Sequence, residues 1–438
     1  MSTPQQEVAP RPTLSEAFKV WFKIGCLSFG GPAGQIAMMH RVVVDEKKWL
    51  PEPRFLHALN FCMLLPGPEA QQLATYIGWL MHGIRGGLVA GILFVLPGAI
   101  LMLALSLLYA YGRGIGIVDG ALFGIKAAVL VIVVEALIRI GKRALTSRWL
   151  VAVAAAAFVG IFFLDLPFPL IVAGAGLIGF LTTRQAAVPP AANDNVTAGV
   201  QGRWRLAALS VAVGLSLWWL PILIAALALG PTHILVSIGL FFSKLAIVTF
   251  GGAYAVLAYM AQQAVENHGW LSAPEMVDAL GLAETTPGPL ILVTQFVGFL
   301  AAFRDAAPFT PLIAGVVGAL LTTWVTFVPS IMWIFAGAPF IENLRGNKRL
   351  AGALAAITAA VVGVILNLSI WFALHVLFGD VTERHVGIVR YYAFDPAALD
   401  RQVAILAVTA AILTFRFHRS LIEVIAVMAL LGMVTRYY

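Results

Sequence analysis

Charged side chains are scarce in this chain. Asp, Glu, Lys and Arg make up 11% of its 438 residues, whereas 61% are hydrophobic; a typical soluble domain has about 25% charged residues. Uninterrupted apolar stretches such as 86–108 and 351–378 exceed the roughly 20 residues that cross a bilayer. The scarcity of charge therefore excludes a soluble domain and predicts a polytopic membrane protein, with the lipid bilayer as a partner.

Cysteines and metal-binding motifs are also few. Cys26 and Cys62 are the only cysteines, which excludes a disulfide framework and a four-thiolate metal site. The sequence has no cluster of histidines at metal-ligand spacing, no phosphate-binding Gly-Lys-Ser/Thr loop and no pair of acids typical of membrane phosphotransfer. These absences predict a protein that is not an enzyme and holds no metal or cofactor. They also disfavour a transporter driven directly by a nucleotide.

The net charge of +7 has an explanation in the membrane. Cytoplasmic loops of membrane proteins are enriched in Lys and Arg, while Asp and Glu contribute little to orientation, so a basic excess is the usual outcome. We therefore expect no nucleic-acid partner.

What the sequence does contain is an internal repeat. Residues 23–68 align with residues 244–289 at a constant offset of 221, without a gap and with 15 identities in 46 positions. The most informative identities are Lys23/Lys244, Phe29-Gly30-Gly31/Phe250-Gly251-Gly252, Trp49-Leu50/Trp270-Leu271 and Pro66-Gly67-Pro68/Pro287-Gly288-Pro289. A composition rich in Ala, Leu and Gly would not place two three-residue motifs in register, so the chain contains an internal duplication.

The charges between the two motifs differ in the two copies. The first copy carries cations and the second only anions, namely Arg41, Lys47, Lys48 and Arg54 against Glu266, Glu275 and Asp278. Because Lys and Arg near membrane segments stay on the cytoplasmic side, the same element faces the cytoplasm in the first copy and the outside in the second. The sequence thus predicts an inverted repeat, the architecture of many secondary transporters.

The predicted fold is all-α, with two inverted-topology repeats of broken and continuous transmembrane helices joined by a central span. Its parts are a polar N-terminus (1–17), a first repeat (18–183), a linker (184–203), a central connecting helix (204–230) and a second, inverted repeat (231–438). Broken segments that cross give thirteen spans, and re-entrant ones give nine. The nine-span arrangement fits the positive-inside rule better. Both arrangements place the N-terminus in the cytoplasm and the C-terminus outside.

The repeated Phe-Gly-Gly and Pro-Gly-Pro motifs interrupt apolar segments at membrane depth. Free backbone groups are tolerated there only where protein buries them or a wet cavity solvates them. The N-termini of half-helices carry partial positive charge and attract anions, so inversion would assemble a preformed anion site near the midplane. The alternative is that the glycines only let helices pack closely. The predicted substrate-binding residues are Lys23, Phe29, Gly30, Gly31, Gln35, Pro66, Gly67, Pro68, Gln72, Lys244, Phe250, Gly251, Gly252, Tyr254, Thr285, Thr286, Pro287, Gly288, Pro289 and Gln295.

Two lysines and two acids near the breaks are candidates for function. Lys23 and Lys244 occupy inversion-related positions and suit a divalent anion, since ionisable residues inside a membrane usually serve a function. The alternative is that their long stems carry the amines to the interface. Glu69 and Glu284 have no acidic counterpart in the other copy, which makes them candidates for a coupling proton or for caps on free N–H groups.

Charges elsewhere in the spans are expected to pair locally. Glu135 and Arg139 are four residues apart and predict an ion pair on one helix face. Lys126 is a candidate partner in the same span.

The motifs of both copies resemble those of the chromate ion transporters, in the long two-domain form. The residues that carry the resemblance are 29–32, 65–78, 94–98, 250–254, 281–289 and 295–299. The resemblance extends over nearly the whole chain. It implies a bacterial inner-membrane protein that exports chromate from the cytoplasm and confers chromate resistance, with sulfate as a structural analogue.

We therefore expect a secondary transporter that exports a tetrahedral divalent oxyanion, chromate first, by alternating access around the breaks. The membrane potential or a counter-ion would drive it. The alternatives are a carrier of sulfate or another oxyanion, a channel, and a membrane-embedded enzyme acting on a lipid phosphate. The enzyme would need a cluster of acids or histidines at one interface, which the sequence lacks. A homodimer is a possible assembly.

Overall fold

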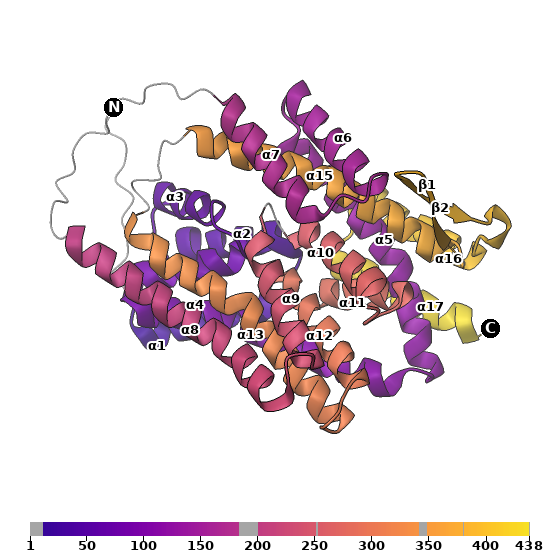
Figure 1. The fold of residues 1–438 in the computed structure, drawn as a ribbon, viewed down its shortest axis with the longest axis horizontal. Helices are drawn as coiled ribbons and strands as arrows, with labels where there is room; N and C mark the ends of the chain where they lie inside the picture. The colour runs from indigo at the N-terminus through magenta and orange to yellow at the C-terminus, as the bar shows by residue number, and fades with distance from the viewer. Residues whose placement is uncertain (1–11, 184–199, 251–252, 341–347, 380, 438) are drawn as a thin grey trace.

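The computed structural model describes residues 12–183, 200–250, 253–340, 348–379 and 381–437, and they are almost entirely helical (Figure 1). Among these described residues, five helices are long and apolar enough to cross a membrane. The prediction of an all-α polytopic membrane protein is confirmed. One element was not expected: a β-hairpin formed by β1 (Val381–Val386) and β2 (Val389–Phe394). The predicted linker lies largely outside the described residues.

The two halves of the chain consist of corresponding short and long helices. The first half contains α1 (Leu14–Leu27), α2 (Gly31–His40), the π-helical turn η1 (Arg41–Glu46), α3 (Glu52–Cys62), α4 (Glu69–Gly112), α5 (Gly116–Ala144), α6 (Arg148–Phe162) and α7 (Phe168–Thr182). The central helix α8 spans Val200–Leu229.

The second half begins after α8 and ends with the C-terminal helix. It contains α9 (Ile234–Val248), α10 (Ala253–Gln262), the π-helical turn η2 (Gln263–Asn267), α11 (Ala273–Thr285), η3 (Leu290–Leu292), α12 (Val293–Arg304), α13 (Pro311–Gly337), η4 (Ala338–Phe340), α15 (Lys348–Leu377), η5 (Pro396–Ala398), α16 (Arg401–Ala411), η6 (Ile412–Arg416) and α17 (Leu421–Tyr437). Shifted by 221, the end of α1 falls on the end of α9 and the start of α3 on the start of α11. The duplication seen in the sequence is therefore also a duplication of backbone structure.

The 44-residue helix α4 folds back on itself. Its backbone leaves helical geometry at His82 and at Gly83, where φ is +60°. Gly78 in the first arm packs so closely on Gly86 in the second arm that a Cβ on either would meet the other's carbonyl. The first arm (69–82) is therefore a half-helix, and only the second arm (84–112) traverses the molecule.

Both broken segments of the first copy enter and leave at one side, which we call the first face. At the start of α1, the Pro12 carbonyl lies 2.7 Å from Nε2 of His82, at the kink of α4. The turn that follows α2 and η1 returns to the same side, where Nζ of Lys47 lies 3.2 Å from Oε1 of Glu16. Each broken segment of this copy is thus re-entrant.

The second copy is arranged in the same way at the opposite side, the second face. His233, which precedes α9, contacts the loop between α12 and α13. Arg304 donates a hydrogen bond of 2.7 Å to the Trp270 carbonyl in the turn after η2. The second arm of α4 starts at the first face and ends here, where the rings of Tyr111 and Phe303 are 5.5 Å apart. The copies therefore enter from opposite faces, which favours the nine-span arrangement.

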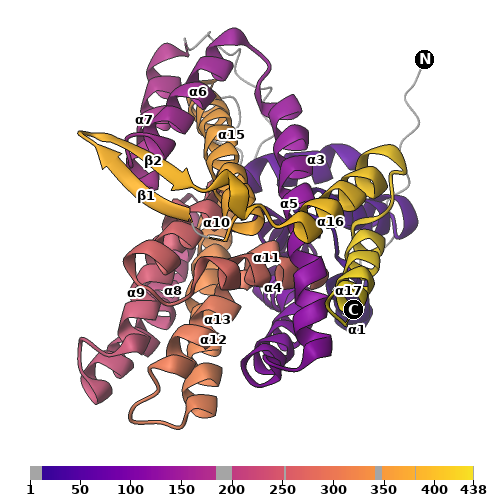
Figure 2. The same cartoon turned by 90° about the vertical axis from the view of Figure 1, so that its right-hand side faces the viewer.

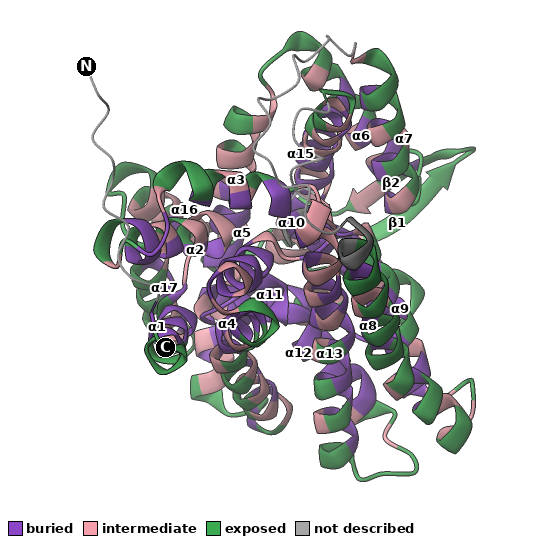
Figure 3. Ribbon diagram, turned by 90° about the vertical axis from the view of Figure 1, so that its left-hand side faces the viewer, coloured by how far each residue is buried: buried purple, intermediate pink, exposed green. Residues whose placement is uncertain are grey.

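The helix α8 lies on the outside of the bundle, where it is mostly exposed (Figure 3). Only 17% of its most apolar 18-residue segment is buried. Its polar anchors are a hydrogen bond of 2.9 Å from Nε1 of Trp218 to Oγ of Ser243, and one of 2.7 Å from Trp324 of α13 to the Leu217 carbonyl. An apolar exposed surface of this kind fits a helix that faces lipid.

The β-hairpin projects from the end of α15 beside the loop between α6 and α7 (Figure 2). Its anchor is Arg390, which is 1% exposed. This guanidinium donates to the carbonyls of Phe162 and Ile161 and lies 2.8 Å from Asp165. Glu266 and Glu383 lie 3.8 and 3.9 Å from the same nitrogen. One arginine thus holds the hairpin, the first copy and the second copy together at the second face.

Candidate functional site

The four helix breaks meet at the centre of the molecule. The N–H of Gly67 donates to the Thr249 carbonyl at 2.9 Å, and the N–H of Gly288 donates to the Ser28 carbonyl at 2.8 Å. These two hydrogen bonds are equivalent under the 221-residue offset, since 28 corresponds to 249 and 67 to 288. The second break of each copy is therefore completed by the first break of the other copy, about a pseudo-twofold axis.

Glycine is required at these contacts for two physical reasons. Gly67 and Gly288 have φ of +131° and +85°, a region that residues with a Cβ rarely adopt. A Cβ on Gly67 would also lie 2.8 Å from Nε2 of Gln72 and 2.9 Å from Oγ of Ser330. Gly30 (φ +85°) and Gly31 (φ +69°) turn the chain from α1 into α2 in the same way. Gly251 and Gly252 lie outside the described residues.

A small cavity lies where the half-helices begin. Its volume is about 20 Å³, and its lining residues are Pro32, Gln35, Pro68, Glu69, Ala70, Thr249, Pro289, Leu290 and Ile291. These residues belong to the first turns of α2 and α4, to η3 ahead of α12, and to the α9 break. Such a volume holds one water molecule, which is smaller than a tetrahedral oxyanion. The described state is therefore closed around a centre that three helix N-termini surround.

The electrostatics of this centre favour an anion. The first N–H groups of a helix have no partner within the helix, and together with the helix dipole they place about half a positive charge at the N-terminus. Three such N-termini line one cavity. Glu69, in the first turn of α4, is the one carboxylate among the lining residues. In this closed state the Glu69 carboxyl group thus stands where a bound anion would be stabilised.

Most predicted polar residues hold the breaks in place. Gln35 donates to the Gly288 carbonyl at 2.5 Å and Gln72 to the Pro66 carbonyl at 2.8 Å. Gln295 donates to the Ala99 carbonyl at 2.9 Å. Within the part of the chain that the structure describes, the Oε1 atoms of Gln72 and Gln295 are buried without a hydrogen bond. Each of these two side chains thus holds a backbone carbonyl through its amide nitrogen, while its amide oxygen is left without a donor.

The acid of the second copy has a specific partner. Tyr254 donates a hydrogen bond of 2.8 Å to Glu284, and its hydroxyl lies next to Gly31 of the first copy. Thr285 and Thr286 turn their hydroxyls back to the Leu282 carbonyl of their own helix. The Phe29 and Phe250 amides bond to carbonyls two residues earlier, at 3.1 and 3.0 Å. The backbone hydrogen bonds of Phe29 and Phe250 are thus equivalent in the two copies.

The structure places the paired lysines away from the cavity. Lys23 and Lys244 are both exposed, and neither lines the central cavity. Nζ of Lys244 lies 5.8 Å from the centre of the Tyr259 ring. In the closed state the positive potential at the centre therefore comes from backbone N–H groups rather than from these amines.

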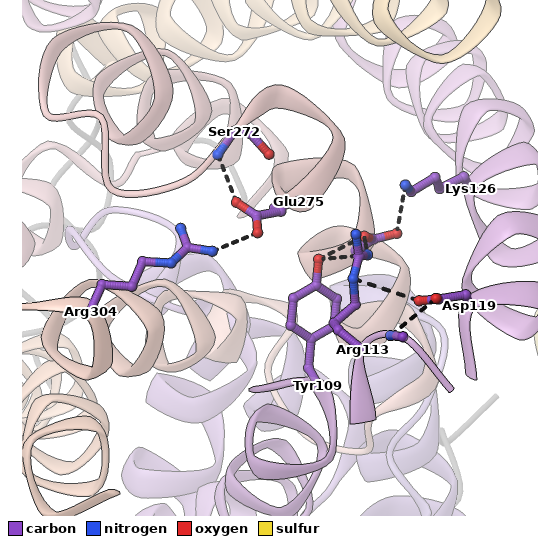
Figure 4. Close-up of polar contacts among 9 residues, drawn as sticks. Tyr109, Arg113, Asp119, Lys126, Ser272, Glu275 and Arg304 are labelled. Carbon is purple, nitrogen blue, oxygen red and sulfur yellow. Dashed lines mark hydrogen bonds and ion pairs between the residues drawn. The ribbon is translucent and has the colours of Figure 1, made fainter. Parts of the chain in front are cut away.

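One charged cluster was not predicted as a unit. Glu135 and Arg139 form the expected pair, at 3.7 Å. Lys126, however, does not extend that pair: its Nζ lies 3.3 Å from Asp278 of α11 (Figure 4). The expectation about Lys126 was wrong because the partner is on another helix, 152 positions further along. The one signal in the sequence was Asp278 itself, an acid in a half-helix.

Comparisons with known proteins agree with this architecture. An inverted repeat whose half-helices meet at a shared centre is typical of secondary transporters. The family model described as Chromate transporter matches residues 15–180 and 236–433, so the chain belongs to the chromate transporter family. No solved structure matches it significantly.

Three curated relatives cover most of the chain. It is 33% identical to the chromate transport protein of Pseudomonas aeruginosa over 370 residues, 82% of this chain and 81% of the relative. It is 27% identical to a probable chromate transport protein of Synechococcus elongatus, covering 82% and 84%. It is 26% identical to the chromate transport protein of Cupriavidus metallidurans, covering 82% of each chain. These relatives are transporters, not enzymes.

Proposed function

We propose that this protein is a secondary transporter that exports chromate from the cytoplasm across the inner membrane by alternating access, and so confers chromate resistance. The observation that carries the proposal is the central cavity, where three half-helix N-termini meet around a closed space. Backbone N–H groups at such N-termini bind tetrahedral oxyanions without needing a full positive charge. Membership of the chromate transporter family and the names of the three relatives support chromate as the substrate.

The reciprocal hydrogen bonds at the breaks suggest how access alternates. Each bond joins a Pro-Gly-Pro turn of one copy to the end of the first half-helix of the other. Rocking one copy against the other would break one bond and open the cavity to one face, and the inverted motion would open it to the other face. With the N-terminus in the cytoplasm and the C-terminus outside, the first face is the cytoplasmic one.

The driving force follows from the charge of the substrate. Moving a dianion out of a cell that is negative inside is favourable, by about 2.3 kcal/mol per charge for each 100 mV. Glu69 lines the cavity, and Glu284 accepts a hydrogen bond from Tyr254, whose hydroxyl lies next to Gly31. Both acids are therefore candidates for carrying a coupled proton. Sulfate has the same tetrahedral shape and charge, and a sulfate carrier is the competing assignment.

The test is uptake of radiolabelled chromate into inside-out membrane vesicles, with excess sulfate as competitor and vesicles without the protein as control. We expect saturable uptake that rises with membrane potential and that sulfate reduces only in large excess. Saturable uptake of labelled sulfate with no uptake of chromate would replace the proposal with the sulfate carrier. No uptake of either anion above control vesicles would contradict an oxyanion transporter.

A further inference from the structure

The charged cluster around Asp278 lies apart from the helix breaks and is built around a fully buried acid. Asp278 is 0% exposed. Its Oδ2 accepts hydrogen bonds from the hydroxyl of Tyr109 at 2.8 Å and from Nη1 of Arg113 at 3.1 Å. Nζ of Lys126 lies 3.3 Å from Oδ1, on the other side of the carboxylate. Figure 4 shows Tyr109 of α4, Arg113 just after α4 and Lys126 of α5 pointing toward one another, around Asp278 of α11.

The donors around Asp278 are of the kind that bind a tetrahedral dianion. A guanidinium, an ammonium and a phenol hydroxyl are side chains that bind oxyanions, the guanidinium with its directed N–H groups. The two cations are balanced by two acids, Asp278 and Asp119, the latter at 3.6 Å from Nε of Arg113. A dianion in the place of the Asp278 carboxylate would offer one oxygen to Arg113 and Tyr109 and another to Lys126.

The cluster also has the exposure expected of an exchangeable site. The Arg113 and Lys126 side chains are 43% and 21% exposed, while Asp278 is fully enclosed. An anion arriving from solvent would therefore meet the cations before the acid. Oδ1 of Asp278 lies 3.3 Å from Nζ of Lys126, so this oxygen is held by the ion pair with Lys126.

Its position places the cluster between the second face and the central cavity. Asp278 is on the half-helix α11, which runs from Ser272 to the break at Pro287. Six residues separate Asp278 from Glu284, about 9 Å along a helix. Nearer the face, Glu275 is already paired with Arg304 and with the Ser272 amide. The acid that faces Arg113 and Lys126 from α11 is thus Asp278.

We propose that Arg113, Lys126 and Tyr109 form a second oxyanion-binding station on the outer part of the transport route, and that Asp278 is a tethered anion that occupies it when no substrate is bound. The inference rests on the proposed function, because it assigns the station to the exported oxyanion. Substrate displaces Asp278 from the cations, and the return of Asp278 displaces the substrate towards the second face. Asp278 thereby speeds release at the cost of affinity.

The test measures binding of radiolabelled sulfate and chromate to the purified full-length protein, together with export in vesicles. We expect Asp278→Asn to lower the Kd for the oxyanion about tenfold, because the internal competitor is gone, and to slow export. Lys126→Gln and Arg113→Gln should each raise the Kd. Glu423→Gln is the matched control, since it removes an exposed acid from Arg419 in another ion pair and should leave the Kd unchanged.

The outcomes separate this inference from the proposed function. Suppose that the wild-type protein binds and exports the oxyanion and that Asp278→Asn has the same Kd. This result would overturn the proposal that Asp278 is a tethered competitor and would leave the proposed function intact. If Asp278→Asn does not fold, Lys126→Gln and Arg113→Gln decide, since an unchanged Kd in both overturns the station. Wild-type protein that neither binds nor exports either oxyanion would overturn both proposals.

Discussion

The two copies share their backbone plan but differ in what surrounds them. The half-helices of the first copy, α1 to α3 and the first arm of α4, pack mainly among themselves in a hydrophobic cluster of their own. The corresponding helices of the second copy, α9 to α12, lie within the main core with the second arm of α4, α5, α13 and α15. Phe18 and Phe22 of α1 are 48% and 49% exposed, whereas their counterparts in α9, Gly239 and Ser243, are buried.

The ionisable side chains near the breaks and in the Asp278 cluster differ as well. Glu69 corresponds to Leu290, Glu284 to Met63, and Asp278 to His57. The symmetric part of the site is backbone and the asymmetric part is ionisable. Under the proposed function, the backbone geometry would provide the pathway that both faces use, and the acids would distinguish loading at one face from release at the other.

The largest expected effect tests the symmetric part. Gly67→Ala and Gly288→Ala should each lower chromate transport at least about tenfold. A side chain at positive φ costs about 1–2 kcal/mol, and in Gly67→Ala the new Cβ also meets Gln72. Transport assays in vesicles at matched protein levels check this. The loss should be at least as large in Gly67→Ala as in Gly288→Ala, because a Cβ on Gly67 would make the closer contacts.

The control for these variants has the same backbone strain without the contact. Gly230, in the loop between α8 and α9, has φ of +96° and open space where a Cβ would lie. Gly230→Ala should therefore keep most of the transport. A loss as large as that of Gly288→Ala would mean that strain alone, and not the meeting of the breaks, explains the result.

A smaller effect is expected from the asymmetric acids. Glu69→Gln removes the carboxylate from the cavity and makes the first copy neutral there, like the second. We expect several-fold slower transport that no longer depends on an imposed pH gradient, measured in proteoliposomes. Glu52→Gln, in the first turn of α3 and exposed, is the matched control. Unchanged gradient dependence in Glu69→Gln would remove Glu69 as a carrier of the coupling proton.

The paired lysines should contribute less than either the breaks or the acids. Lys23→Ala and Lys244→Ala should each retain saturable uptake, reduced less than about threefold, or about 0.7 kcal/mol. The reason is that neither amine lines the cavity in the closed state. If both variants abolish uptake while protein levels hold, the lysines bind substrate in another conformation and the backbone is not sufficient.

The smallest effect concerns the hairpin, an element that only the second copy has. Burial, and then the neighbouring Glu383 carboxylate, raise the pKa of Glu266 from 4.5 to about 7. The docked hairpin therefore binds a proton that the undocked form releases, so docking weakens as pH rises from 4.5 through 7. The hydrogen-exchange protection factors of residues 381–394, which are corrected for the intrinsic pH dependence of amide exchange, should be higher at pH 5.5 than at pH 7.5. Glu266→Gln should make the protection factors equal at the two pH values, and a difference that persists would assign it to another group.

The features that repeat could be predicted from the sequence, whereas the contacts between the two copies could not. The offset of 221 located both breaks in each copy, because Gly at positive φ and Pro at a helix start are local requirements. The bonds from Gly67 to Thr249 and from Gly288 to Ser28 join different copies, and no local signal specifies them. The ion pair between Lys126 and Asp278 also joins the two copies, so no local signal in the sequence specifies it.

The hairpin was missed because its signal is weak beside that of the spans. Residues 381–394 alternate only partly in polarity, and Gly387, with φ of +62°, provides the turn. Arg390 appears in the sequence as one more basic loop residue. Its burial depends on three carbonyls and three acids that the fold brings together.

The reciprocal bonds at the centre have a consequence for biosynthesis. When the ribosome has completed the first half, the Gly67 N–H and the Ser28 carbonyl have no partners, and each such group in a dry environment costs about 1–3 kcal/mol. Their partners are made only with the second half. Until the second half is inserted, the first half must therefore remain in the bilayer in a solvated or loosely packed form. Nascent chains cut after α7 should be recognised as incomplete, whereas separately made halves inserted in opposite orientations should complement each other.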